Sequence, residues 1–442
     1  MTPQRVARSY YLIAGLYTLS ASVIWGVNTL FLLDAGLDIF EVFIANAAFL
    51  AGMVVFEIPT GVVADTLGRR ISFLASVVVL MVSTLLYVGL AQVEGGVVAY
   101  SVVSVFMGLG FTFYSGAVEA WLVDALHSTG FDGQLDSIFA RGQMISGAAM
   151  LVGTVGGGLL GQIDLAIPFL VRAGLLAALF VIATARMHDV GFSPRRPAAR
   201  AYPAEMRRVA RSSIEFGWNQ REIRLLMVAA FVQGTFFMWA FYAWQPYFLE
   251  LLDDDAVWVA GIVSALISLS TMAGNAIVEY ASRLCTRRTT LLLWAAGVQT
   301  AAAVVVGLTT SFWVAVPVFL LITGAMGVRM PVRQSYIHHI VPTEQRATVV
   351  SFDSMVSGVG GVGGQAGLGA LSQSASISAG FVVGGLGTVL ILPVLTLLRR
   401  LDGAADRLAP GEEAGSDGTA AACGLPAVST VESRDREELG VE

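Results

Sequence analysis

The chain has 442 residues, of which 56% are hydrophobic and only 13% are charged, and it carries a formal net charge of −6. Its mean hydropathy is +0.73. One water-soluble core cannot hide so much apolar surface, which excludes an ordinary soluble globular protein and places the chain in a lipid bilayer.

Apolar runs long enough to cross the membrane recur along the chain. A helix needs about 20 apolar residues to span about 30 Å of hydrocarbon, and about twelve such runs are present. They cover residues 10–33, 39–64, 71–91, 95–124, 138–163 and 166–187, and then 225–250, 256–281, 290–309, 312–336, 348–372 and 376–398. The sequence therefore predicts an all-α membrane protein with twelve transmembrane helices.

A basic, proline-containing segment divides these spans six and six. We expect a first six-helix half over residues 1–187, a cytoplasmic linker over 188–224, a second half over 225–400 and a disordered cytoplasmic tail over 401–442. Arginine-bearing connectors alternate with acidic ones, so the positive-inside rule places both termini and the linker in the cytoplasm. Cys285 and Cys423 fall on that reducing side, and no disulfide is expected.

The second span contains the stretch "FEIPTGVVADTLGRR", residues 56–70. Glu57 is an acid inside an apolar run, so it pairs, becomes protonated or faces a transport path. A rise of about 1.5 Å per residue puts it about 12 Å deeper than Asp65. Pro59 adds a kink that makes the helix easier to distort. Two interpretations stay open for Glu57: a proton-coupling residue, or a structural acid held by its neighbours.

The turn after the second span recurs in altered form in the second half. "GVVADTLGRR" (61–70) and "EYASRLCTRR" (279–288) both end in an arginine pair. Aligning the pairs puts Glu279 opposite Gly61 and Arg283 opposite Asp65, so the second copy has lost the acid and both glycines. Repeated six-helix halves are typical of a secondary transporter, whose substrate site lies near the midplane between them.

These stretches carry a family resemblance. "GVVADTLGRR" is similar to the signature between helices 2 and 3 of the major facilitator superfamily, and "EIPTG" before it resembles a subgroup of bacterial, mostly efflux-type members. Supporting matches are "SGAVEAWLVDAL" (115–126), "WQPYF" (244–248) and "EQRATVVSFDSM" (344–355). Thr66 departs from the family, which usually has a basic residue there. Residues 147–161 resemble the glycine-rich antiporter motif of helix 5 but lack its Gly-Pro pair, which leaves antiport open.

The resemblance implies a gate. In the family this turn braces helix 2 against helix 11 and closes the cytoplasmic side. Glycine allows close approach and a sharp turn, and an aspartate can sit against a helix N-terminus. The residues that match the signature are Gly61, Asp65, Gly68, Arg69 and Arg70. Arg69 or Arg70 is then expected to reach Asp124 at the cytoplasmic end of helix 4. The alternative is a loop whose arginines only fix topology.

Glu119 in helix 4 is the second acid at membrane depth, and Arg141 is the nearest basic residue in the sequence. A pair that breaks when the acid is protonated can act as a switch that lets the helices move apart. A permanent pair that holds helices 4 and 5 together is the alternative. Together with Glu57 and Asp124, these residues form the predicted proton-coupling set.

The second half contributes its own polar residues. Arg329 and Arg333 lie one turn apart on one face of helix 10, and Asp353 lies just inside helix 11. Pairing with Asp353 or Glu279 is the simpler interpretation, because buried arginines need partners; an anionic group of the substrate is the other. In the family, helices 1 and 7 enter the cavity, and their aromatic and amide side chains suit a bulky amphipathic or apolar compound. The predicted cavity residues are Trp25, Asn28, Gln233, Trp239, Tyr242, Gln245, Arg329, Arg333 and Asp353.

The residues and the resemblance together predict a secondary active transporter of the bacterial inner membrane. We expect proton-coupled export of a small lipophilic organic compound, such as a drug or secondary metabolite, by alternating access. The alternative is a proton-coupled symporter or exchanger of an anionic metabolite, with Arg329 or Arg333 as its ligand. The spans show no catalytic or metal-ligand spacing and no Walker sequence, so we expect no enzyme activity, cofactor, metal or ATP coupling. The expected partners are the substrate, protons and lipid, without nucleic acid, and a monomer is expected.

Overall fold

The computed structural model describes residues 2–131, 133–191, 211, 218–342 and 346–408, and almost all of them are helical. The first half contains α1 (Pro3–Ser22), α2 (Asn28–Asp34), α3 (Ile39–Leu67), α4 (Arg69–Gln92), α5 (Val97–Tyr114), α6 (Ala117–Ser128), α7 (Leu135–Gly161) and α8 (Ile167–Arg186). The second half contains α10 (Arg221–Leu252), α11 (Val257–Leu284), α12 (Arg288–Leu308), α13 (Phe312–Ile340), α14 (Arg346–Ser374), α15 (Ile377–Gly387), the 3₁₀ turn η4 (Thr388–Leu390), α16 (Ile391–Arg400) and the 3₁₀ turn η5 (Ala404–Asp406).

These helices confirm the predicted fold class, with each predicted span matched by a helix or by a pair of helices. Ten segments are long and apolar enough to cross a membrane by length and composition. The α1–α2 pair and α14 supply the other two spans. Helices suit this setting because backbone polar groups in hydrocarbon must be hydrogen-bonded within the segment. Most of the predicted linker and the tail beyond residue 408 lie outside the described residues.

Three of the predicted spans, each expected as one continuous helix, are interrupted. The first breaks at residues 23–27 between α1 and α2, the fourth at residues 115–116 between α5 and α6, and the last at η4. Gly116 has a φ of +71°, in the left-handed region that other residues reach only with strain. Hydropathy does not detect such a break, because one turn residue barely changes the mean of a long apolar window.

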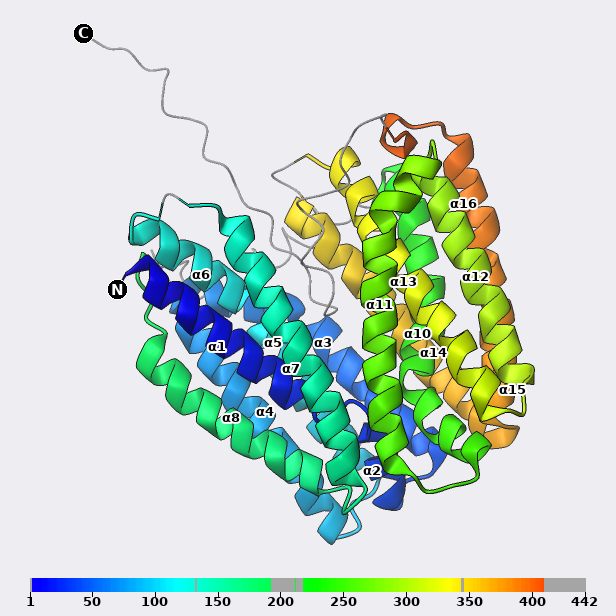
Figure 1. Cartoon of the computed structure of the whole chain (residues 1–442), viewed down its shortest axis with the longest axis horizontal. Coiled ribbons are helices and arrows are strands. Elements are labelled where there is room, and N and C mark those ends of the chain that lie inside the picture. The colour runs from blue at the N-terminus through cyan, green and yellow to red at the C-terminus, as the bar shows by residue number, and fades with distance from the viewer. Residues whose placement is uncertain (1, 132, 192–210, 212–217, 343–345, 409–442) are drawn as a thin grey trace.

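The two six-helix bundles approach one another at one end of the molecule, near α2, and diverge toward the other (Figure 1). We call the first of these the acidic end, because its connectors contain Asp38, Asp164 and Asp254. The opposite, arginine-rich end contains the turns at Arg69 and Arg287. The conformation is therefore one in which the halves meet at the acidic end.

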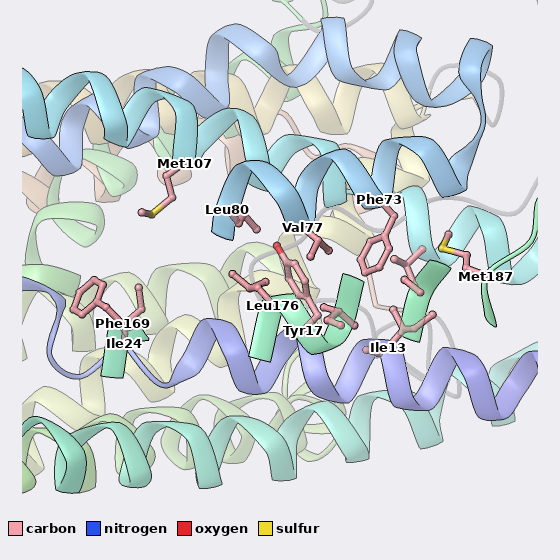
Figure 2. Close-up of a cluster of buried hydrophobic side chains, with 14 of the residues drawn as sticks. Ile13, Tyr17, Ile24, Phe73, Val77, Leu80, Met107, Phe169, Leu176 and Met187 are labelled. Carbon is pink, nitrogen blue, oxygen red and sulfur yellow. The ribbon is translucent and has the colours of Figure 1, made fainter. Parts of the chain in front are cut away.

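Each half has its own apolar core. In the first half, side chains from α1, α4 and α8 converge in one cluster, drawn in Figure 2, to which α5 adds Met107. The second half has one cluster toward the acidic end and another toward the arginine-rich end. Phe43 of α3 belongs to the cluster at the acidic end of the second half, so part of that core is shared between the halves.

Glycines let the halves come close, because small residues allow membrane helices to approach one another. A methyl group added at Gly158 of α7 would lie 2.6 Å from the Cα of Gly261 in α11. A methyl group added at Gly369 of α14 would lie 2.8 Å from the Cβ of Phe43 in α3. Larger side chains at these positions would push the halves apart.

The two halves anchor the helix after the signature turn in the same way. The N–H of Arg70, in the first turn of α4, donates to Asp189 Oδ1 at 2.9 Å. The N–H of Thr289, which like Arg70 is the second residue of its helix, donates to Asp406 Oδ1 at 2.8 Å. Each aspartate follows the last helix of its half and stabilises a helix N-terminus, where an anion is favoured. The internal repeat thus extends to a shared helix cap.

In the second half this cap involves the start of the predicted tail. Arg288 Nη1 donates to the carbonyl of Ala405 at 2.7 Å, and Arg287 forms an ion pair with Asp402 at 2.9 Å. An isolated β-bridge joins Arg287 to Arg407. Residues 402–407 therefore fold onto the start of α12, although their composition predicts disorder, because arginines of the altered second turn bind them.

Candidate functional site

A hydrogen-bonded seal joins the halves at the acidic end. Gln245 of α10 is fully buried, with 0% of its surface exposed. Its side-chain oxygen accepts from the N–H of Thr29 at 3.0 Å, and its amide nitrogen donates to the carbonyl of Trp25 at 2.8 Å. The Thr29 hydroxyl donates to the carbonyl of Tyr242 at 3.1 Å. The break between α1 and α2 exposes backbone groups, and Gln245 satisfies two of them.

A second polar contact lies at the rim of the same end. The amide nitrogen of Gln162, just after α7, donates to the carbonyl of Asp255 at 3.2 Å. Its oxygen accepts from the N–H of Trp258 in α11 at 3.2 Å. Gln162 is exposed, unlike Gln245. The contact of α2 with α10 and the contact of α7 with α11 are therefore both closed at the acidic end.

The predicted cavity aromatics occupy different surroundings. Trp239 is fully buried and packs against Phe43 of the first half and Phe381 of the second, with ring centroids at 5.9 and 5.0 Å. Its indole N–H has no hydrogen-bond partner among the described residues. Trp25 is half-buried and meets Phe241 edge to face at 6.2 Å. Trp239 is thus part of the shared core, whereas Trp25 lies at the helix break.

An asparagine pair lies beside this break. Asn28, the first residue of α2, donates from its side-chain nitrogen to the side-chain oxygen of Asn46 in α3 at 3.2 Å. Asn46 is buried, and its own amide nitrogen has no partner among the described residues. The pair is a polar spot in an otherwise apolar contact between α2 and α3.

The second half contains a buried amide and guanidinium network. Gln233 of α10 donates to the side-chain oxygen of Gln299 in α12 at 3.2 Å, and Arg329 of α13 donates to the same oxygen. Arg329 is buried, and none of the ion pairs between described residues includes it. The neutral Gln299 is therefore the hydrogen-bond partner of this cation in the described part of the chain.

Arg333 has the partner that the simpler interpretation predicts. It forms an ion pair with Asp353 of α14, and both side chains are largely buried. Glu279, the other predicted partner, instead pairs with Arg283 at 2.5 Å on the exposed surface of α11. The expected contact between Glu279 and a helix 10 arginine is therefore absent from the described residues.

Glu57 lies half-buried on α3. Its carboxylate has no hydrogen bond or ion pair to any residue that the structure describes. Pro59 lacks an N–H, so the carbonyl of Val55 loses its usual helical donor, and the Thr60 hydroxyl donates to the neighbouring carbonyl of Phe56 at 2.8 Å. The neighbours that would hold Glu57 as a structural acid are thus not found in this part of the chain.

Glu119 lies in the first turn of α6, directly after the break at Gly116. This position places its carboxylate at a helix N-terminus, where an anion is favoured. It lies close enough to Tyr10 of α1 to interact with it electrostatically. Arg141 is exposed at the start of α7, and no ion pair joins it to Glu119 within the described ranges. The predicted Glu119–Arg141 switch is not formed in this conformation.

The signature turn makes its contacts within the first half. Arg69 pairs with Asp65 at 2.7 Å, and Arg70 Nη2 donates to the carbonyl of Thr184 at the end of α8 at 2.9 Å. Neither arginine forms an ion pair with Asp124, which has none with the residues described here. Arg69 nevertheless lies close enough to Asp124 to interact with it electrostatically, while its ion pair is with Asp65 across the turn at Gly68.

The turn also lies apart from helix 11 in this conformation. A methyl group added at Gly358 of α14 would lie 2.7 Å from Val54, but one added at Gly61 would meet nothing within 4 Å among the described residues. Gly68 has a φ of +111°, so it needs glycine for the backbone and not for close packing. The α3–α14 contact that closes the arginine-rich end in the family is not made at Gly61.

Sequence reasoning missed one buried charge in the first half. Arg172 of α8 is only 6% exposed. It lies one turn from Phe169 and from Leu176, on the face of α8 that packs into the core. The signal was present, because Arg172 is the one charged residue in the apolar run 166–185. Gln299 was missed as well, although it is a polar residue inside the apolar run 290–309.

The described residues contain no group of three or more His, Cys, Asp or Glu side chains that could hold a metal ion. Cys285 is a free thiol, and Cys423 lies outside the described residues. The chemistry available at the site is therefore that of carboxylates, guanidinium groups, amides and aromatic rings.

Comparison with known proteins supports the same architecture. A family model of the Major Facilitator Superfamily matches residues 10–289 and 259–432. The chain is 18% identical over 388 residues to the uncharacterized MFS-type transporter YxaM of Bacillus subtilis (strain 168), covering 87% of this chain and 94% of that protein.

Solved structures of transporters share the fold. The nucleoside transporter NupG is 12% identical with a TM-score of 0.73, and covers 89% of this chain and 99% of its own. The human organic anion transporter MFSD10 (TETRAN) is 16% identical with a TM-score of 0.59, and covers 89% and 100%. A POT family transporter in complex with a thioalcohol-conjugated peptide is 11% identical with a TM-score of 0.70, and covers 89% and 96%. With the family match over both halves, the chain belongs to the major facilitator superfamily of membrane transporters.

Proposed function

We propose that the protein exports a small, largely apolar organic compound in exchange for protons, by alternating access between its two halves. In this proposal the protein lies in the bacterial inner membrane, and one chain forms the transport unit. The arginine-rich end faces the cytoplasm, as the positive-inside rule requires. The conformation described above is then closed at the outer side, with the substrate site accessible from within.

The main support for this proposal is that two acids at membrane depth have no basic partner in the part of the chain that the structure describes. The carboxylates of Glu57 and Glu119 have no basic partner among the described residues. A carboxyl group at membrane depth must pair, contact water or bind a proton, because an isolated charge there is costly. Proton uptake or release by these acids is therefore coupled to a conformational change that alters their burial or their contact with water.

Glu57 is well placed to transmit such a change. It lies on α3 between Val54, which contacts Gly358 of α14, and the signature turn at Asp65. Neutralising Glu57 makes its burial against α14 less costly. Burial there would bring the turn toward helix 11 and close the arginine-rich end, while the seal around Gln245 opens. The acid and the turn thus act as one coupled element.

The aromatic side chains favour a substrate with an apolar body. Trp25 and Tyr242 lie at the break between α1 and α2, at the contact between halves where such transporters bind substrate. The titles of the similar structures mention nucleosides, organic anions and peptides. At 11–16% identity these neighbours support the fold and leave the substrate open.

A second candidate function is proton-coupled symport or exchange of an anionic metabolite. It is favoured by Arg329, which is buried without a carboxylate partner in the described residues. Arg333 is a weaker candidate ligand, because Asp353 already neutralises it. In this alternative Arg329 breaks its hydrogen bond to Gln299 and binds the substrate anion instead.

Reconstituted protein can decide between these functions. Proteoliposomes carry a pH-sensitive dye, and an outward or inward gradient of each compound is imposed from a panel of lipophilic cations, neutral antibiotics and aromatic acids. The variants are Glu57→Gln and Glu119→Gln. The matched control is Glu279→Gln, which removes a carboxylate that pairs with Arg283 on the exposed surface. The control should keep wild-type proton movement.

We expect at least one compound gradient to drive protons in the opposite direction in the wild type. Glu57→Gln or Glu119→Gln should abolish that movement while the compound still binds. If protons instead move in the same direction as an organic anion, and Arg329→Gln abolishes this, the export proposal is wrong and the second candidate replaces it. Proton movement that persists in both acid variants would show that other groups carry the coupling.

A further inference from the structure

We infer that Arg172 binds an acidic group of the transported compound, so that the substrate is an organic anion with an apolar body. This inference rests on the proposed transport function and adds the charge of its substrate. It concerns the first half and is independent of Arg329, which lies in the second half.

The first observation is the burial of an unsatisfied cation. Arg172 is 6% exposed, and its Nε has no hydrogen-bond partner among the described residues. None of the ion pairs between those residues includes it. A guanidinium group has five N–H donors and remains protonated in proteins. A buried charge of this kind needs a counter-charge or strong acceptors, and this part of the chain supplies no carboxylate.

The second observation is the set of groups that face Arg172. Its electrostatic neighbours are Tyr17 of α1, Tyr87 of α4 and Tyr242 of α10. Tyrosine hydroxyls are neutral, so they can orient an anion beside the guanidinium but cannot neutralise it. Tyr242 belongs to the second half, which places Arg172 toward the contact between the halves. A substrate held there would touch both moving parts.

The tyrosines are not equally available. The Tyr87 hydroxyl is already hydrogen-bonded to Ser104. The Tyr17 hydroxyl is buried without a partner of normal hydrogen-bond geometry among the described residues. It lies near Ser76, whose hydroxyl donates to the carbonyl of Gly110 at 2.6 Å. The Tyr17 O–H, which interacts with the Ser76 hydroxyl here, can donate instead to the same anion as Arg172.

The packing around Arg172 argues against a purely structural role. Phe169 and Leu176, one turn to either side, point into the apolar cluster together with Tyr17 (Figure 2). A leucine or methionine would fill this position of α8 without the cost of burying a charge. The guanidinium instead offers a planar pair of donors that matches a carboxylate, sulfonate or phosphate. The aromatic and aliphatic surroundings suit a compound with an apolar body.

The test measures binding by the full-length purified protein in lipid nanodiscs. The probes are matched pairs that differ only in charge: benzoate with benzamide, 1-naphthoate with 1-naphthamide, and indole-3-acetate with its amide. Inorganic phosphate and sulfate test whether a bare anion suffices. The variants are Arg172→Gln, Arg172→Lys and Tyr17→Phe, with Arg283→Gln as the control for loss of an exposed arginine. Calorimetry gives the affinities, and circular dichroism verifies folding.

We expect the wild type to bind at least one acid about tenfold or more tightly than its amide. Arg172→Gln should abolish that preference and leave amide binding unchanged. Arg172→Lys should restore part of it, because the charge returns without the planar donor pair. Tyr17→Phe, which removes only a hydroxyl, should weaken acid binding and keeps the test valid if Arg172→Gln does not fold.

Either of two results would overturn the inference. One is equal affinity of the wild type for every acid and its amide, with no binding of phosphate or sulfate. The other is an acid preference that survives in folded Arg172→Gln. Failure here is distinguishable from failure of the transport proposal, because compounds that drive proton movement without an acid preference would retain the proton-coupled function and remove only the charge assignment. Acid binding that depends on Arg172, in a protein that moves no protons, would retain the charge assignment and remove the proton-coupled function.

Discussion

Replacing Gln245 with leucine should open the acidic end of the molecule. Leucine keeps the volume near that of glutamine but removes the hydrogen bonds to the N–H of Thr29 and the carbonyl of Trp25. Each buried hydrogen bond contributes about 1 kcal/mol net, so the closed state should lose about 2 kcal/mol. In the open state water satisfies the same backbone groups. The ratio of open to closed molecules should therefore rise about 30-fold.

A cysteine at Ser264 reports this change. Ser264 is buried on α11, and its hydroxyl would lie 3.3 Å from a methyl group added at Gly26, within the closed contact. In a background with Cys285→Ser and Cys423→Ser, a membrane-impermeant maleimide reaches Ser264→Cys only when the acidic end opens. The alkylation rate should rise about 30-fold in Gln245→Leu, in proportion to the open fraction.

Gln162→Leu is the matched control. It also removes two hydrogen bonds across the halves, but at an exposed rim where water replaces them. Its effect on the alkylation rate should stay below about threefold. Equal rates for Gln245→Leu and the parent protein would show that the buried glutamine does not hold the halves together, and the account of the seal would be wrong.

Three further predictions concern helix packing and helix ends. Gly158→Val should favour the conformation that is open at the acidic end, because even a methyl group would lie 2.6 Å from Gly261 Cα; a rise in Ser264→Cys alkylation would reveal this, and an unchanged rate would contradict it. Gly116→Ala should lower the free energy of unfolding by about 1–2 kcal/mol, because alanine is strained at a φ of +71°, and thermal denaturation in detergent should show a lower midpoint than the parent protein. Asp189→Ala should lower the free energy of unfolding by about 1 kcal/mol, because the α4 cap is lost. Asp406→Ala should lower it at least as much, because the α12 cap is lost. Unchanged denaturation midpoints would argue against the shared cap.

The sequence predicted the fold because hydropathy acts over whole spans. Runs of about 20 apolar residues identify membrane helices, since a helix of at least about that length is needed to cross the hydrocarbon. The interruptions at 23–27 and at Gly116 could not be found in this way, although the Ser-Gly dipeptide at 115–116 is a turn signal. The fold of residues 402–407 was missed because composition alone does not show that Arg287 and Arg288 bind them.

The candidate site was predicted less completely than the fold. Asp353 was correctly expected as a partner of a helix 10 arginine, because a buried arginine must be neutralised. The partner of Arg329 is an amide, Gln299, and sequence distance cannot reveal a contact between α12 and α13. Gln245, predicted to line the cavity, hydrogen-bonds across the contact between the halves in this conformation. The contact of Arg69 with Asp65 belongs to one conformation, and a single sequence does not state which conformation is populated.

The most direct test of the account is whether the two ends of the transporter open reciprocally when protons bind. Spin labels at Ile163 and Asp254 report the acidic end, and labels at His127 and Leu284 report the arginine-rich end; all four positions are exposed. Electron–electron distances are measured in nanodiscs between about pH 8 and about pH 5, the range over which membrane carboxyl groups can exchange protons. The account predicts that one distance grows as the other shrinks. Distances that stay fixed at both ends, or that change in the same direction, would contradict it.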